Sequence, residues 1–157
     1  MDPVITIGYL LQHTATMLMR QSDQILQERL GIGMSQLRIL MMLQHVPNTQ
    51  QRKLADRLGQ TEASISRQIK LLQEKGLLTA RVNPKSRREH LTVPTTRGIK
   101  MTEAALDVLT HYHSPMIELL TDKQREQLQT GLRIFHDHIC APNKPFACDH
   151  PFRKEES

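Results

Sequence analysis

The chain has 157 residues, which suffices for one domain with a hydrophobic core and is short for two. No stretch approaches the roughly 20 apolar residues of a membrane-spanning helix. Its N-terminus lacks the basic segment of a secretion signal, and two cysteines are too few for a disulfide framework in a chain of this size. We therefore expect a cytoplasmic protein that has no membrane partner.

Basic residues are concentrated in the middle of the chain. Residues 52–100 contain 12 Lys and Arg against 4 Asp and Glu, whereas the rest of the chain contains 9 against 12. A surface that neutralises phosphates has this kind of composition, because contact with phosphate releases bound counterions. A solvated basic face has it too. Charge alone leaves both interpretations open, and the spacing of the residues has to decide between them.

The N-terminal third of the chain predicts two helices. Apolar residues recur at steps of three, four and seven up to Gly31, which predicts one long helix with a single apolar stripe. The stripe consists of Ile7, Leu11, Leu18 and Ile25, with Leu10, Met17 and Leu26 beside them. A second helix is expected from about Ser35 to His45. A long helix with an apolar stripe needs a surface against which to bury it.

Two short helices and a hairpin follow. The first begins after Thr49 and stops at Gly59, where a left-handed residue commonly ends a helix. Thr61 is positioned to cap the second, which ends at Gly76. Two short helices joined by a glycine-containing turn predict a helix-turn-helix. The runs 77–82 and 89–93, separated by turn-forming and charged residues, predict a hairpin with a basic tip.

The second short helix has the pattern of a DNA-reading element. If Ile65 faces the core, Ala63, Arg67 and Lys70 point to the opposite side. Small residues let the helix approach base edges, while the basic side chains reach guanine acceptors or phosphate. An ordinary amphipathic surface helix is the competing interpretation. Together with the basic hairpin, the pattern favours DNA contact, and the candidate residues are Thr61, Ala63, Ser64, Ser66, Arg67, Gln68, Lys70, Arg87 and Arg88.

The C-terminal part predicts two more helices and a tail. Thr95 begins a helix expected to run to about His113, and Ser114 followed by Pro115 predicts that the chain bends there and restarts. Thr121 with Gln124 forms the sequence signature of a capping box before the last helix. Residues 141–157 contain three prolines and several charges, and we expect them to form a flexible tail.

This order of elements, over about residues 30–140, resembles the MarR family of bacterial transcription regulators. The residues that carry the resemblance run in series, namely Leu54-Ala55-Asp56-Arg57-Leu58-Gly59, Ser64-Ile65-Ser66-Arg67, Leu72, Lys75-Gly76-Leu77-Leu78, Arg81, Asn83-Pro84, Arg87-Arg88, Leu91-Thr92, Thr95 and Gly98. Gln68 stands where the family tends to have an apolar residue. The fold expected is mainly α with a small β-hairpin wing, a winged helix-turn-helix with long N- and C-terminal dimerisation helices.

The resemblance implies a sequence-specific double-stranded DNA-binding regulator. It would be a homodimer on a pseudo-palindromic operator, with a recognition helix in each of two successive major grooves and wing arginines in the adjacent minor grooves. We expect it to be a repressor relieved by a small-molecule, redox or metal signal. The expected organisation is one domain over residues 1–140, with the helix-turn-helix at about 49–76, the wing at about 77–94, and dimerisation helices at about 4–30 and 95–140.

The signal that such a regulator would sense is left open by the sequence. A small-molecule effector could bind between the first two helices, and the candidate lining residues are His13, Met17, Met41 and His45, although a methionine at helical spacing is more often part of a core. Cys140 and Cys148 lie among His136, His138 and His150, which suits thiol oxidation or metal binding, yet no spacing matches a closed metal site. We predict no metal and no other cofactor.

Two other classes of function compete with DNA binding. An enzyme would need a nucleophile, a base and an orienting group, and Cys140 with His136 lacks the third. We therefore expect no catalysis. The alternative is a winged-helix protein-interaction module without specific DNA readout. Such a surface would carry aromatic side chains, where this chain has Arg67, Lys70, Arg87 and Arg88.

Overall fold

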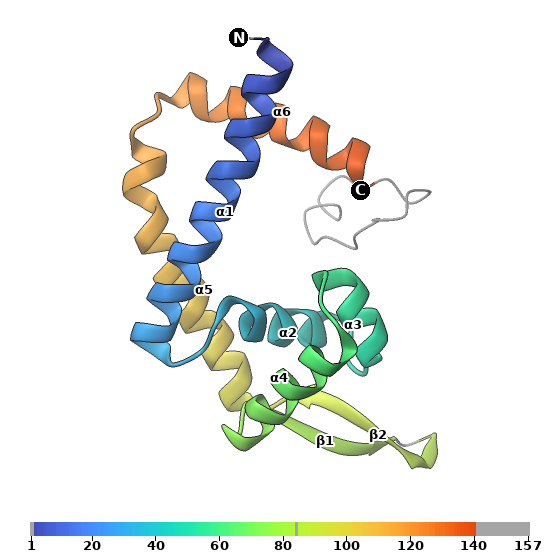
Figure 1. The fold of residues 1–157 in the computed structure, drawn as a ribbon. Helices are drawn as coiled ribbons and strands as arrows, with labels where there is room; N and C mark the ends of the chain where they lie inside the picture. The colour runs from blue at the N-terminus through green and yellow to red at the C-terminus, as the bar shows by residue number, and fades with distance from the viewer. Residues whose placement is uncertain (1, 84, 141–157) are drawn as a thin grey trace. The chain divides into compact units, whose positions relative to one another are not determined.

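The computed structural model of the protein describes residues 2–83 and 85–140, and the side chains of residues 81–83 and 86–91 lie outside what it describes. The predicted tail, 141–157, also lies outside the described residues. The chain divides into two compact units, Met1–Tyr112 and His113–Ser157. The first contains the helix-turn-helix and the hairpin, and the second contains the last helix (Figure 1). The boundaries of the predicted single domain stay a prediction.

The element order is α1 (Pro3–Leu30), α2 (Met34–His45), α3 (Gln51–Leu58), α4 (Glu62–Glu74), β1 (Leu78–Asn83), β2 (Ser86–Pro94), α5 (Thr96–Glu118) and α6 (Asp122–Ile139). This confirms the predicted fold class, mainly α with a small antiparallel hairpin. None of the helices in the described residues is both long and apolar enough to cross a membrane.

Glycines end the helices where the sequence predicts. Gly31, Gly59 and Gly76 all have φ between 62° and 69°, a left-handed conformation that a residue with a Cβ adopts at a cost. At the other ends, Asp2 caps α1 by accepting a hydrogen bond from Val4 N at 2.8 Å, and Thr121 with Gln124 forms the predicted capping box of α6. Local sequence signals therefore determine where most of these helices begin and end.

The core of the first unit is built around α2. Leu37, Ile39, Leu40 and Leu43 of this helix are completely or almost completely buried, and α2 contacts α1, α3, α4 and β2. The other elements contribute smaller numbers of buried apolar residues. Figure 1 shows α2 between α1 and the pair formed by α3 and α4. The helix-turn-helix is thus held in place by burial against one central helix.

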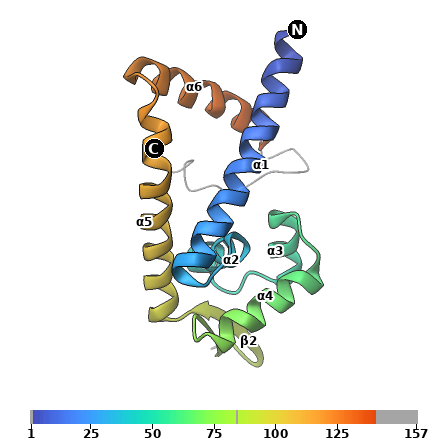
Figure 2. The ribbon, with the colours of Figure 1, turned by 60° about the vertical axis from the view of Figure 1, so that its left-hand side comes forward.

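The wing joins the rest of the unit at its base. Asn48 N, in the connection after α2, donates to Thr92 O of β2, and Thr95 N donates to Leu77 O just before β1. Both views show the hairpin at the same end of the unit as α4 (Figures 1 and 2), and β1 contacts α4. The base of the wing is therefore fixed by hydrogen bonds to two connecting segments as well as by packing.

The tip of the hairpin differs from the prediction. The sequence suggests a loop over residues 83–88, whereas β2 begins at Ser86 and the pairing steps from Val82↔His90 to Asn83↔Ser86. Over that step β2 has additional residues that β1 lacks, and they include Arg87 and Arg88. The sequence prediction is too long a loop, because turn-forming residues are visible in the sequence whereas a β-bulge leaves no clear signal in it. The side chains of both arginines lie outside the described residues.

The predicted bend at Ser114 and Pro115 is wrong. Pro115 lies inside α5, which continues to Glu118. A proline in a helix interior removes one backbone hydrogen bond and usually kinks or ends the helix. Here it falls in the last turn of α5, where few further bonds are lost, so the helix ends soon after it and α6 begins only after its own cap at Thr121.

Close backbone packing at Gly98 supplies a test of this fold. A Cβ added to Gly98 of α5 would lie 2.1 Å from Leu77 O, so the backbone would have to move. We predict that Gly98→Ala lowers the free energy of unfolding by about 1–3 kcal/mol, although alanine favours helix by about 1 kcal/mol. The measurement is urea unfolding followed by circular dichroism. The control is Gly131→Ala on α6, where nothing lies within 4 Å of the added Cβ; it should be neutral or stabilising. Equal stability of the two variants would contradict the close approach.

Candidate nucleic-acid interface

Helix α4 is amphipathic in the way the sequence predicts. Ile65, Ile69 and Leu72 are buried, and the opposite side of the helix is exposed. The side chains on that exposed side include those of Ala63, Ser66, Arg67 and Lys70, with Glu74 at the C-terminal end of the helix. An α-helix whose one face is buried in a small unit and whose other face presents small and basic residues can enter a major groove. This face, Ala63, Ser66, Arg67 and Lys70, is called the reading face below.

The remaining predicted residues of α4 have different surroundings. Thr61 is the N-cap, and its hydroxyl oxygen accepts a hydrogen bond from Ser64 N at 3.1 Å. Ser64 is half-buried, and its hydroxyl donates to Gln60 Oε1 at 3.2 Å. Gln68 is also half-buried, on the flank of the helix. Thr61 and Ser64 therefore build the start of the helix, whereas the reading face extends from it.

The wing places its basic residues on the same unit as α4. The backbone of Arg87 and Arg88 belongs to β2, at the step in register near the tip. Lys85 lies in the turn and is exposed. A β-bulge commonly redirects side chains from the regular alternation of a strand. The described residues thus combine a helix that exposes Arg67 and Lys70 with a hairpin whose turn exposes Lys85, in one compact unit.

The predicted effector residues do not form one buried site in the described chain. His13 and His45 are exposed, Met17 is 38 % exposed, and Met41 is half-buried against the hydrophobic core. The ring of His13 stacks on Tyr9 with centroids 5.5 Å apart. A hollow of about 410 Å³ lies on the same unit, between α1, the start of α2 and Gln60, and its lining includes Arg20 and Arg38. The effector assignment stays a prediction.

The C-terminal cysteines and histidines are only partly described. Cys140 is the C-cap of α6 and is half-buried, and Cys148 lies outside the described residues. His136 Nδ1 lies 3.1 Å from Asp137 Oδ1. Within residues 2–83 and 85–140, no three His, Cys, Asp or Glu side chains gather into a group that could hold a metal ion.

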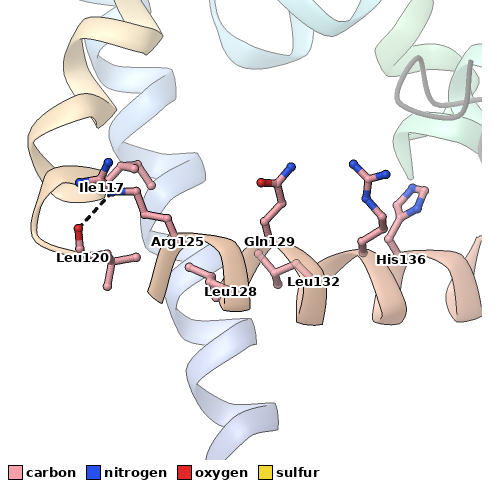
Figure 3. Close-up of a pocket in the computed structure, with 8 residues that line it drawn as sticks. Ile117, Leu120, Arg125, Leu128, Gln129, Leu132 and His136 are labelled. Carbon is pink, nitrogen blue, oxygen red and sulfur yellow. Dashed lines mark hydrogen bonds between the residues drawn. The ribbon is translucent and has the colours of Figure 1, made fainter. Parts of the chain in front are cut away.

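The second unit carries an apolar hollow on its surface. Its volume is about 550 Å³, and Figure 3 shows around it Leu128 and Leu132 of α6, Ile117 near the end of α5, and Leu120 after that helix. Arg125 at its rim donates from Nε to Leu120 O at 3.0 Å and lies 3.2 Å from Asp122. No residue of α6 is buried in the single chain. The apolar residues of this helix thus face solvent unless another chain covers them.

The sequence model of the MarR family matches residues 30–89, which include α2, the helix-turn-helix and most of the wing. These 60 of the 157 residues are similar to the MarR family. No curated protein matches it by sequence.

Solved structures of MarR-family regulators share the fold. A crystal structure of MarR superposes with a TM-score of 0.70 at 20% identity, covering 82% of this chain and 89% of that one. The Mycobacterium tuberculosis MarR family protein Rv2887 with salicylic acid superposes with a TM-score of 0.70 at 22% identity, covering 82% of this chain and 94% of that one. MepR, a transcription regulator of a Staphylococcus aureus multidrug efflux pump, superposes with a TM-score of 0.67 at 22% identity, covering 83% of this chain and 96% of that one. These superpositions show that the chain has the winged helix-turn-helix fold of these proteins.

Sequence reasoning locates the reading face but misses the polar contacts behind it. Gln60, in the turn between α3 and α4, bonds to Ser35 as well as to Ser64. Ser35 lies 25 residues earlier in the chain. Periodicity within one helix cannot reveal a contact between side chains this far apart in sequence. A glutamine directly after the helix-ending Gly59 is the only local signal.

The cap of α4 provides a test of how the interface is positioned. Thr61→Ala removes the oxygen that accepts from Ser64 N, and we expect a loss of about 1 kcal/mol in the free energy of unfolding. Thr61→Ser keeps a hydroxyl and should retain most of that stability. Urea unfolding of both variants, followed by circular dichroism, decides the matter. If Thr61→Ala were as stable as the unmodified chain, the cap would contribute nothing to α4.

Proposed function

We propose that this chain is a cytoplasmic, sequence-specific double-stranded DNA-binding regulator that acts as a homodimer and catalyses no reaction. The observation that carries the proposal is the reading face of α4, which presents Arg67 and Lys70 opposite the buried residues Ile65, Ile69 and Leu72. The excess of basic residues over residues 52–100 supports it, since phosphate contacts supply most of the non-specific affinity for DNA. The match of residues 30–89 to the sequence model of the MarR family supports it as well.

We infer different roles for the helix and the wing in DNA binding. A helix with small residues beside an arginine brings that arginine to base edges, where guanidinium pairs with guanine O6 and N7. A hairpin tip with Arg87 and Arg88 is suited to the minor groove, where a narrow groove attracts basic side chains. We therefore assign sequence readout mainly to α4 and backbone and groove-shape contacts mainly to the wing.

Homodimerisation is supported by the apolar surface that the single chain exposes. In the first unit Val4, Ile5 and Tyr9 of α1 are 77 %, 62 % and 60 % exposed. In the second unit α6 exposes large apolar side chains of its own, namely Leu128, Leu132 and Phe135, and the first two line the hollow of Figure 3. Exposed apolar surface on this scale marks an interaction site. A second copy of the same chain is the occupant we propose, because a two-fold arrangement covers the same helices on both chains.

The dimer brings two copies of α4 to one duplex. A two-fold symmetric protein matches a pseudo-palindromic operator, with the half-sites about one helical turn apart. Repression relieved by a signal is the mode of action we propose. Rv2887, which shares the fold, was solved with salicylic acid, and this supports a small molecule as the signal, with His13, Met17, Met41 and His45 as the candidate residues. Thiol oxidation at Cys140 and Cys148, or a metal ion, are the other signals to test.

The proposed function is tested by selecting duplexes from a random-sequence pool with the purified full chain. We expect enrichment of a pseudo-palindromic sequence, because a symmetric dimer reads each half-site with the same residues. The absence of any enriched sequence, with the protein folded, would favour the alternative of a protein-interaction module.

The assignment of roles is tested with Arg67→Ala and Arg88→Ala. On the selected duplex Arg67→Ala should cost about 1–3 kcal/mol of binding free energy and much less on a scrambled duplex. Arg88→Ala should weaken binding to both duplexes and reduce the slope of log affinity against log salt by about 1 for each phosphate that the wing no longer neutralises. Binding isotherms at several salt concentrations give both quantities. Equal losses on the two duplexes for Arg67→Ala would remove it from base readout, and an unchanged salt slope for Arg88→Ala would remove the wing from the complex.

The dimer is tested by sedimentation without DNA. We expect the unmodified chain to be a dimer at micromolar concentration, and Leu132→Glu to shift it toward monomer because a carboxylate would replace an apolar side chain in the contact. Val46→Glu, at an exposed apolar residue of the first unit, is the matched control and should leave the dimer intact. A monomeric unmodified chain with its helices intact would refute the dimer.

A further inference from the structure

Gln60 connects three helices of the first unit. Its backbone N donates to Ala55 O of α3 at 3.0 Å. Its side-chain Nε2 donates to Ser35 Oγ of α2 at 2.8 Å, and its Oε1 accepts from Ser64 Oγ of α4 at 3.2 Å. Ser35, Gln60 and Ser64 are all half-buried, so water screens these hydrogen bonds less than it would at a fully exposed site. The contacts between Ser35, Gln60 and Ser64 are called the Gln60 bridge below.

The α2 end of the bridge is itself held firmly. Met34 N, next to Ser35, donates to Asp23 Oδ1 of α1 at 2.8 Å, and Gly33 N donates to Gln36 Oε1 at 3.3 Å at the start of α2. Gly33 is buried, and a Cβ there would lie 2.8 Å from Asp23 Oδ1. The start of α2 is therefore attached to α1 and closely packed, which makes Ser35 a fixed anchor.

The α4 end of the bridge lies in the turn that carries the reading face. Ser64 is in the first turn of α4, directly between Ala63 and Ile65 and close before Arg67. Burial of Ile65, Ile69 and Leu72 fixes how closely α4 packs, but apolar burial is non-directional. Hydrogen bonds have preferred angles and lengths. A hydrogen bond from Ser64 to an anchored glutamine therefore restricts the rotation and the axial position of this turn.

We propose that Gln60 is a positioning residue that fixes the first turn of α4 to the start of α2, and so determines how Ala63, Ser66 and Arg67 meet the bases. This role rests on the proposed DNA-binding function and adds a residue outside the reading face to it. Base readout requires contacts at hydrogen-bond distance, and a small rotation of the first turn displaces all of them together. Phosphate contacts tolerate such a change better, because attraction between charges depends weakly on angle. The bridge therefore supports specificity more than overall affinity.

The bridge itself is tested without DNA, by hydrogen exchange of backbone amides in the full chain. In Gln60→Ala the amides of residues 64–67 should exchange about 3- to 10-fold faster, as expected for the loss of hydrogen bonds worth about 1 kcal/mol. The amides of Leu40 and Leu43 in α2 should be unchanged. The control is Gln73→Ala, a glutamine removed from the exposed surface near the other end of α4, which should leave residues 64–67 unchanged. Unchanged exchange in Gln60→Ala would overturn the proposal.

The consequence for DNA is tested by a double-mutant cycle on a duplex selected from the random pool and on its scrambled version. Gln60→Ala and Ser35→Ala should each lower the ratio of the two affinities by about 3- to 10-fold, and Ser35→Ala should add nothing once Gln60 is alanine, because the anchor acts through Gln60. Additive losses, or equal losses on both duplexes, would overturn the proposal.

If Gln60→Ala proves too unstable to measure, Ser35→Ala removes the anchor alone, and its exchange rates at residues 64–67 decide the same question. If the unmodified chain selects no sequence, the proposed function fails while hydrogen exchange still decides the bridge.

Discussion

Burial of α2 is the interaction on which the rest of the first unit depends. Its apolar residues contact α1 on one side and the helix-turn-helix on the other, and β2 also packs on it. Removing a buried leucine from such a helix costs the transfer free energy of the side chain and leaves a cavity shared by several elements. The reading face is exposed only because α4 buries Ile65, Ile69 and Leu72 in this shared core. A well-packed α2 is therefore the condition for a defined exposed face on α4.

Much of this arrangement could be predicted from the sequence, because local signals determine it. Gly31, Gly59 and Gly76 end helices as predicted, Thr61 caps α4, and Thr121 forms its cap with the expected Gln124. The exposed side of α4 follows from placing Ile65 in the core, since a helix has a fixed rotation per residue. These predictions need no knowledge of which elements pack together.

Features that depend on pairing between distant residues could not be predicted. The Gln60 bridge joins residues 25 positions apart, and the step in register between Val82 and Asn83 depends on how two strands align. At Pro115 the local signal is present but misleading, because a proline near the end of a helix disturbs it less than one in the middle. The reading face could thus be located from sequence, whereas the contacts that orient it could not.

The attachment of the wing has a mechanical consequence. The hairpin is clamped at its base, where Asn48 N bonds to Thr92 O and Thr95 N bonds to Leu77 O, and the step in register lies further along, toward the tip. The hairpin is therefore attached at one end only, and its unattached part extends from Thr92 toward the tip. A force on the tip from a nucleic-acid groove would be transmitted through these two hydrogen bonds to the segment that joins α2 to α3. The short segment 46–50 would then set how far the wing can move, although it carries none of the side chains expected to touch DNA.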